Sequence, residues 1–163
     1  MRLTCVLFLV LLLAVAVKSS PARAEAAEGL VGSVTTVKGP VHLVRGGNEI
    51  VTEKGARLYL SDVIRTGEGG GVGVVLRDDT TLSLGPSSEL KLSEFKFKPD
   101  EGVLGMTLGL LKGTLVFISG QIAKLAPGSA QIETPAGVAA VRGTELLVEA
   151  PAAKAPKRSE GTK

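Results

Sequence analysis

Cysteine, histidine and aromatic residues are scarce in this sequence of 163 residues, and each scarcity excludes a class of site. The one cysteine, Cys5, lies in the apolar N-terminal segment, so the rest of the chain has no thiol for a disulfide, a nucleophile or a metal. His42 is the one histidine, which excludes a histidine pair at a metal. We expect it to be a surface or half-buried strand residue rather than a catalytic base, because no Gly-x-Ser-x-Gly turn accompanies it.

A basic excess is also missing once the two ends are set aside. The chain has 19 lysines and arginines against 16 aspartates and glutamates, but three of the basic residues lie in the first 24 residues and four lie after residue 150. The remainder is slightly acidic. A nucleic-acid binder needs a basic patch for phosphates and, for single strands, aromatic side chains on which bases stack. We therefore expect no nucleic-acid partner.

The N-terminus has the three parts of a signal peptide. Arg2 is the basic region, Leu3 to Val17 form the apolar region, and Ala22-Arg23-Ala24 is a small-x-small cleavage site. The apolar run is shorter than the roughly 20 residues that span a bilayer. We predict a signal helix cleaved after Ala24, no stable membrane span after cleavage, and a periplasmic or secreted product. An uncleaved membrane anchor is the alternative.

The C-terminal segment, residues 150–163, is rich in alanine, proline and lysine and has no apolar periodicity. This composition predicts a disordered tail. The tail is either simply solvated or in weak contact with acidic polymers of the cell envelope. The predicted organisation is a signal peptide (1–24), one all-β domain (25–149) and this tail (150–163).

Apolar residues alternate with glycine or polar residues in nearly every segment between the two ends, which is typical of β-strands. Leu90 and Leu92 share one parity, whereas Phe95 and Phe97 have the other. Because a slip of one residue exchanges the two faces of a strand, this change of phase predicts a bulge or bend near Ser93-Glu94. The run 110–118 is apolar on both parities and predicts a strand that is covered on both faces.

Glycine-rich turns separate the alternating runs, as at Lys38-Gly39-Pro40 and Gly46-Gly47-Asn48. Many short strands with tight turns predict an all-β fold. Two weak echoes, VIRTGEGGGVGVVL and QIETPAGVAAVRGTELLV, favour a solenoid-like β-roll. A β-sandwich or barrel is the alternative.

Two further features resemble binding sites only superficially. The glycine run 69–73 leads into a strand rather than a helix, so it does not predict a phosphate loop. Asp78-Asp79 predicts a turn rather than a calcium site, since calcium needs six to eight oxygen ligands. We assign no catalytic residue, no metal ligand and no cofactor.

The sequence allows two interpretations of Arg142, one buried and one exposed. By strict alternation it shares the core-facing parity of its neighbours. If it is buried, it needs a carboxylate partner, and Asp62 and Glu133 are the candidates. If Gly143 resets the phase, Arg142 is an exposed residue at a bend.

Two segments, Gly55 to Leu92 and Thr134 to Val148, resemble the FecR domain family. The matching residues of the first are Leu60, Asp62, Val63, Ile64, Thr66 and Gly67, and those of the second are Thr134, Pro135, Val141, Arg142, Gly143 and Thr144. Ser61 and Asp79 stand where glycines are usual in the family. The resemblance implies an all-β extracytoplasmic domain that binds other proteins and turns over no substrate. We expect these motif residues to be structural.

The resemblance therefore predicts a non-catalytic exported domain that acts as a protein-interaction or signalling module in the cell envelope, with another envelope protein as its partner. A cell-wall or glycan binder is one alternative, although it would be expected to show an aromatic platform. An anti-sigma regulator of cell-surface signalling is the other, since the best-known members of the family relay iron-uptake signals to a sigma factor. Those members carry a cytoplasmic segment, whereas only Met1 and Arg2 precede the apolar run here.

Overall fold

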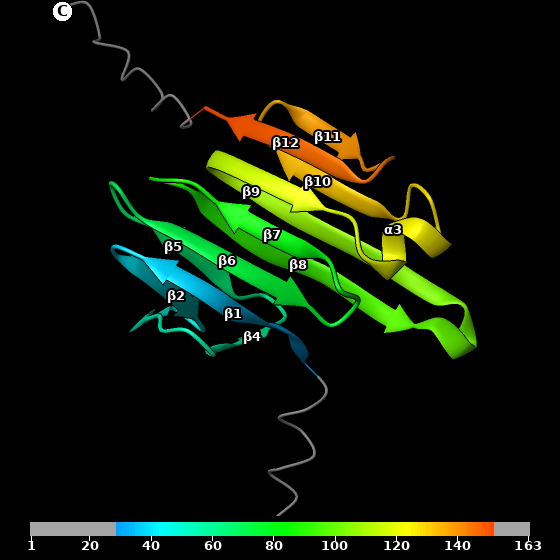
Figure 1. Cartoon of the computed structure of the whole chain (residues 1–163), viewed down its shortest axis with the longest axis horizontal. Coiled ribbons are helices and arrows are strands. Elements are labelled where there is room, and N and C mark those ends of the chain that lie inside the picture. Colours follow the sequence, from blue (N-terminus) through cyan, green and yellow to red (C-terminus); the bar gives the residue numbers. More distant parts are fainter. Residues whose placement is uncertain (1–28, 152–163) are drawn as a thin grey trace, which may run out of the picture.

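Strands account for most of residues 29–151, the part of the chain that the computed structural model describes (Figure 1). In chain order they are β1 (Leu30–Lys38), β2 (Val41–Arg45), β3 (Asn48–Val51), β4 (Arg57–Tyr59), β5 (Val63–Thr66), β6 (Gly71–Leu76), β7 (Thr81–Leu84), β8 (Glu89–Lys98), β9 (Val103–Ile118), β10 (Ala130–Thr134), β11 (Gly137–Ala140) and β12 (Glu145–Ala150). A 3-10 turn, η1 (Pro99–Glu101), joins β8 to β9, and a short helix, α3 (Gln121–Leu125), joins β9 to β10. The all-β prediction is confirmed.

Strand β9 connects the two halves of the sheet. Its first half lies between β8 and β10, and its second half lies between β7 and β12. The order along the sheet is β3-β2-β5-β8-β9-β7-β6-β1-β4. Within the described residues every pairing is antiparallel except that of β9 with β10. The solenoid-like winding is not confirmed, because these are the ladders of one curled sheet, which is closer to the sandwich or barrel alternative.

The curl of the sheet depends on a change of phase inside β9. Met106, Leu108 and Leu110 are buried on one parity, and Leu115 and Phe117 are buried on the other. Between them Gly113 has a φ of 88°, and a Cβ on it would lie 2.5 Å from the Cα of Ser88. Only glycine fits this backbone position, where the strand bends from one half of the sheet to the other.

The phase change corrects the prediction of a strand covered on both faces at 110–118. Leu111 is 43% exposed and Ile118 is 41% exposed, so the outer face of β9 is open there. The run looks apolar on both parities because two alternating patterns of opposite phase meet at Gly113. By contrast, the bulge predicted near Ser93-Glu94 is confirmed, since the register of β8 against β9 shifts between Leu92 and Glu94.

The core lies inside the curl and is aliphatic. Its largest fully buried side chains come from β4 to β9 and from α3, and they include Leu58, Ile64, Leu82, Leu92, Phe117 and Ile122. Burial of each such side chain contributes roughly 1.5–3 kcal/mol. Ile122 closes the core at the end where α3 lies.

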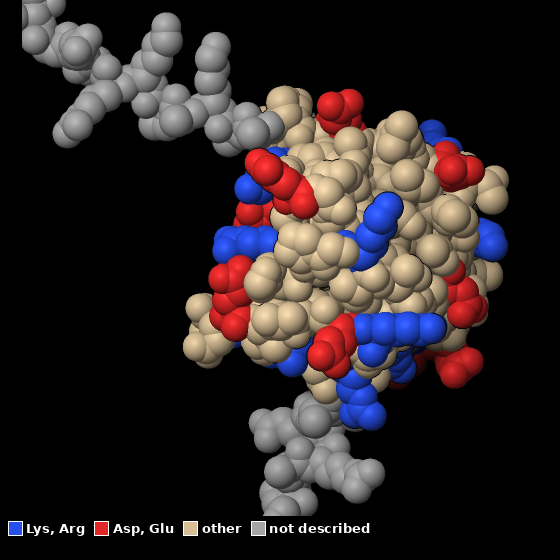
Figure 2. Space-filling view, turned by 60° about the vertical axis from the view of Figure 1, so that its left-hand side comes forward, with Lys and Arg blue, Asp and Glu red and all other residues tan. Residues whose placement is uncertain are grey.

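The two ends of the chain lie mostly outside the described residues. The predicted signal helix falls there, as do residues 152–163 of the predicted tail. Ala150 is the last residue of β12 and is buried opposite Gly113, so the sheet includes the first residue assigned to the tail. Within residues 29–151 no helix has the length and apolar character needed to cross a membrane. Figure 2 shows acidic and basic side chains interspersed on one face of the domain.

Candidate functional site

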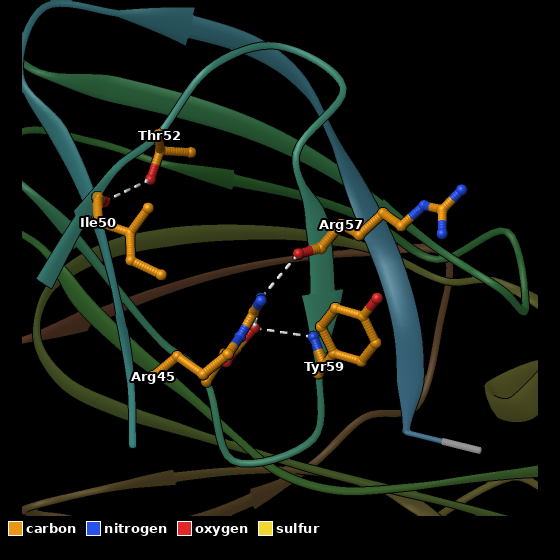
Figure 3. A network of polar contacts seen from close by, with 6 residues as sticks. Arg45, Ile50, Thr52, Arg57 and Tyr59 are labelled. Atoms are coloured by element: carbon orange, nitrogen blue, oxygen red, sulfur yellow. Dashed lines mark hydrogen bonds and ion pairs between the residues drawn. The ribbon is translucent and has the colours of Figure 1, made fainter. Parts of the chain in front are cut away.

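Asp62 is the centre of a polar network at the junction of β2, β4 and β5. Figure 3 labels its partners Arg45 and Tyr59. It lies in the turn before β5 and is 1% exposed. Its carboxylate accepts hydrogen bonds from Nε of Arg45 at 2.8 Å, from Nη2 of Arg45 at 2.7 Å and from the backbone N–H of Tyr59 at 2.8 Å. A bidentate, charge-assisted pair of this kind holds both strand ends in one geometry.

Arg45 makes two further contacts in the same network. Its Nη2 also donates to the carbonyl of Arg57 at 2.9 Å, and its guanidinium lies 4.5 Å from the centre of the Tyr59 ring. The hydrogen bond to Asp62 raises the pKa of Arg45 above its ordinary value, against a smaller opposing effect of burial. Through these hydrogen bonds Arg45 joins the end of β2 to β4 and to the turn before β5, so the network is a structural joint.

The predicted ion pair of Arg142 is wrong. Arg142 is exposed in the loop between β11 and β12, and Asp62 pairs with Arg45 instead. Gly143 has a φ of 130° and resets the phase, so that Val141 rather than Arg142 is buried. Alternation in β2 contained the correct signal, because Arg45 has the same parity as the buried Val41 and Leu43.

Thr66 and Gly67, the next motif residues, form a second interior joint at the end of β5. The Thr66 hydroxyl donates to the carbonyl of Gly85 at 2.7 Å and accepts from the N–H of Ser88 at 2.8 Å. Gly67 donates its N–H to the carbonyl of Pro40 at 2.9 Å, and a Cβ on it would lie 2.8 Å from Cγ of that proline. These contacts support the structural role expected of both residues.

Two positions where the family usually has glycine adopt the backbone conformation that favours glycine. Ser61 has a φ of 69° and Asp79 has a φ of 65°. A side chain at such a φ crowds the following carbonyl, which costs most residues about 1–2 kcal/mol. The departures noted in the sequence therefore fall at turns with a left-handed backbone.

Apart from the buried Val141, the second half of the motif lies at or near the surface. Thr134 caps the turn from β10 to β11, where its hydroxyl donates to the carbonyl of Gly137 at 3.0 Å, and Pro135 beside it is exposed. The carbonyls of Gly143 and Thr144 accept hydrogen bonds from the hydroxyl and the N–H of the buried Ser119. No hydrogen bond or ion pair among residues 29–151 joins this half of the motif to Asp62, Thr66 or Gly67.

A hollow of about 440 Å³ lies beside this second half of the motif. Arg142 and Lys124 supply its two cations, and it is lined by Ala123, Lys124, Pro127, Arg142, Gly143 and Thr144. Short helix α3 forms the opposite wall. The motif therefore presents its arginine to solvent rather than to the core.

The turn predicted at Asp78-Asp79 joins β6 to β7, and it also anchors α3, which the sequence did not indicate. Asp78 is fully buried, and its carboxylate accepts hydrogen bonds from the Thr80 hydroxyl at 2.7 Å and from the N–H of Ile122 at 3.3 Å. Gln121 donates to Asp79 at 2.8 Å. The Asp78 carboxylate is occupied by internal donors, and within the described ranges no three His, Cys, Asp or Glu residues cluster as metal ligands.

The burial and contacts of His42 and of the aromatic residues in the described part of the chain are those of structural residues. His42 is half-buried in β2, as expected, with its Nδ1 3.8 Å from Glu49. Tyr59 is covered by Arg45, and Phe117 is buried in the core. The rings of Phe95 and Phe97 are 6.4 Å apart and tilted by 47°, so they do not form one flat surface.

Comparison with known proteins gives one match. A family model described as FecR protein matches residues 62–158, which is more than half of the chain and includes every motif residue except Leu60. No curated protein matches the chain, and no solved structure does so.

Proposed function

Because the chain belongs to the FecR protein family, whose members are regulators rather than enzymes, we propose that it is a non-catalytic protein-interaction module in cell-envelope signalling. The family match over residues 62–158 carries this proposal. The exported, periplasmic location rests on the signal-peptide pattern of residues 1–24. The partner in this proposal is another envelope protein.

The chemistry of the described residues supports a binding role. The two buried acidic groups, Asp62 and Asp78, are each held by several internal donors and serve as joints between elements. A general acid or base must reach a substrate proton, whereas these carboxylates face inward. The exposed features of the domain are apolar side chains, turns and scattered charges, which suit contact with a protein surface.

A protein partner is also favoured over a glycan. Sugar rings commonly stack on a flat, exposed aromatic side chain, as other apolar faces do. Tyr59 is engaged by Arg45, Phe117 is buried, and Phe95 and Phe97 are half-buried and tilted. The described residues therefore offer no aromatic platform.

Affinity capture from the envelope of the source organism tests the proposal. The full chain, with a C-terminal tag, is expressed in its own cells, cross-linked and purified, and an exported protein of unrelated fold with the same tag is the control. We expect at least one envelope protein to be enriched over the control by mass spectrometry. Retention of glycan fragments without any protein, together with co-sedimentation with purified peptidoglycan, would overturn the proposal.

The same purified material tests export. N-terminal sequencing is expected to begin at Glu25, because cleavage after Ala24 removes the leader. A sequence that begins at Met1 would contradict the predicted signal peptide and favour the uncleaved anchor.

A further inference from the structure

Strand β8 has one edge that is left unpaired over its second half. On the side of β5, pairing covers Glu89–Lys91, and Ser61 and Asp62 then bond the backbone of Leu92. From Ser93 to Lys98 no described strand pairs with this edge, although β9 pairs with the other edge as far as Lys98. Figure 1 shows this end of β8 extending with β9 beyond the shorter strands. Alternate backbone N–H and C=O groups of an unpaired edge are free to bind another strand.

An apolar groove runs beside the free edge. It has a volume of about 340 Å³ and lies between the end of β8 and the start of β1. Phe95 and Phe97 form one wall and are half-buried, because the bulge at Ser93 turns them towards the inside of the curl. Leu60 and Val103, on the rim, are 45% and 41% exposed. A groove of this kind accepts the side chains of every second residue of an added strand.

The charged residues of the groove are all basic. Arg77, Lys96 and Lys98 line it, and no carboxylate does. Lys96 and Lys98 are paired with Glu94 and Glu101, which stand outside the groove, and all four side chains are between 43% and 64% exposed. Lys96 lowers the pKa of Glu94 by its hydrogen bond. Exposed pairs contribute little stability, so both lysines can exchange these carboxylates for those of a partner.

We propose that the free edge of β8 and this groove bind an extended segment of a partner protein, apolar at alternate positions and acidic between them. The segment adds as a strand to Ser93–Lys98, places its apolar side chains against Phe95 and Phe97, and its carboxylates against Lys96, Lys98 and Arg77. This inference rests on the proposed interaction function and names its surface. A second copy fits the groove less well, because it would bring two sets of the same cations together.

A short labelled peptide of alternating valine and aspartate is the probe, and fluorescence anisotropy on the purified full chain is the readout. We expect saturable binding and, in hydrogen exchange, protection of alternate amides in Ser93–Lys98. A valine–lysine peptide and a proline-interrupted valine–aspartate peptide should each bind at least about tenfold more weakly, which corresponds to about 1.4 kcal/mol.

Two variants separate the groove from general charge effects. Lys96→Glu combined with Lys98→Glu reverses the rim, whereas Lys54→Glu combined with Lys91→Glu makes the same change of net charge at exposed positions outside the groove. We expect the first pair to weaken binding at least about tenfold and the second to leave it within about twofold. Val103→Asp, at an exposed rim position, should weaken it as well.

The proposal is overturned if the valine–aspartate peptide does not bind, if both double variants bind it equally, or if the rim variants abolish self-association of the chain measured by sedimentation. Envelope capture with the Lys96→Glu, Lys98→Glu variant distinguishes the two levels of inference. If this variant and the wild type retain a partner equally, the groove is not its binding site, but the proposed interaction function is still supported. If neither retains a protein, the proposed function itself fails.

Discussion

The two halves of the family motif differ in burial and in the kind of contact that their residues make. Asp62 and Thr66 are 1% and 6% exposed, and their side chains join strands that are far apart along the chain. Arg142, Gly143 and Thr144 lie in an exposed loop, where backbone carbonyls make the contacts and the arginine side chain faces solvent. The contrast separates a first half whose side chains make buried contacts from a second half whose arginine side chain is exposed and whose contacts come from the backbone.

Asp62→Ala should have the greatest effect on stability. The substitution leaves the Arg45 guanidinium and the Tyr59 N–H without their acceptor, so we expect a loss of about 3 kcal/mol in the free energy of unfolding. Urea unfolding followed by circular dichroism measures it. Asp100→Ala, at an exposed position in η1, is the control and should change stability little. Equal, small losses in both variants would show that the first half of the motif is not an interior joint.

Thr66→Val should come next. Valine keeps the shape of threonine but removes the hydroxyl that serves both Gly85 and Ser88, so the buried N–H of Ser88 and the partly buried carbonyl of Gly85 lose this partner. We expect a loss of about 2 kcal/mol by the same unfolding measurement. Thr81→Val in β7, where the described structure has no side-chain hydrogen bond, should be close to neutral. A larger loss of stability for Thr81→Val than for Thr66→Val would show that the hydrogen bonds of the Thr66 hydroxyl do not stabilise the fold as proposed.

Ser61→Gly should stabilise the protein. Glycine relieves the left-handed conformation at this turn but gains more freedom in the unfolded chain, so the expected net gain is about 0.5 to 1 kcal/mol. Ser83→Gly, the same change in the extended strand β7, should instead destabilise by a similar amount. Thermal melting of the two variants measures both signs. A loss of stability at Ser61 would show that this turn has adapted to serine.

Arg142→Ala should have the least effect, because its side chain is exposed and the contacts of its loop come from the backbone. We expect the free energy of unfolding to change by no more than about 0.5 kcal/mol. Arg45→Ala, measured beside it, should lose clearly more, since that arginine is part of the interior network. A loss above about 1 kcal/mol for Arg142→Ala would remove the contrast between the two halves.

Local patterns predicted much of the fold but misplaced its polar contacts. Alternation indicated the strands, and the change of parity between Leu92 and Phe95 located the bulge of β8. Strict alternation through Gly143 suggests Arg142 as a partner of Asp62, whereas a reset of the phase at Gly143 leaves Arg142 exposed, as it is. The actual partner is Arg45, which has the parity of two core residues. The anchoring of α3 by Asp78 depends on residues separated by 44 positions, and no local pattern reports such a contact.

The amino-acid sequence by itself determined the all-β class and the main turns, because side-chain period and turn chemistry act over a few residues. Its two motifs indicated the FecR family, which the match over residues 62–158 shows. Only the tertiary structure decided which charges meet, where β9 changes phase, and which edge of β8 stays unpaired. Those features arise from strands that are distant in sequence and are brought together by burial of a common core, so each depends on the whole curled sheet.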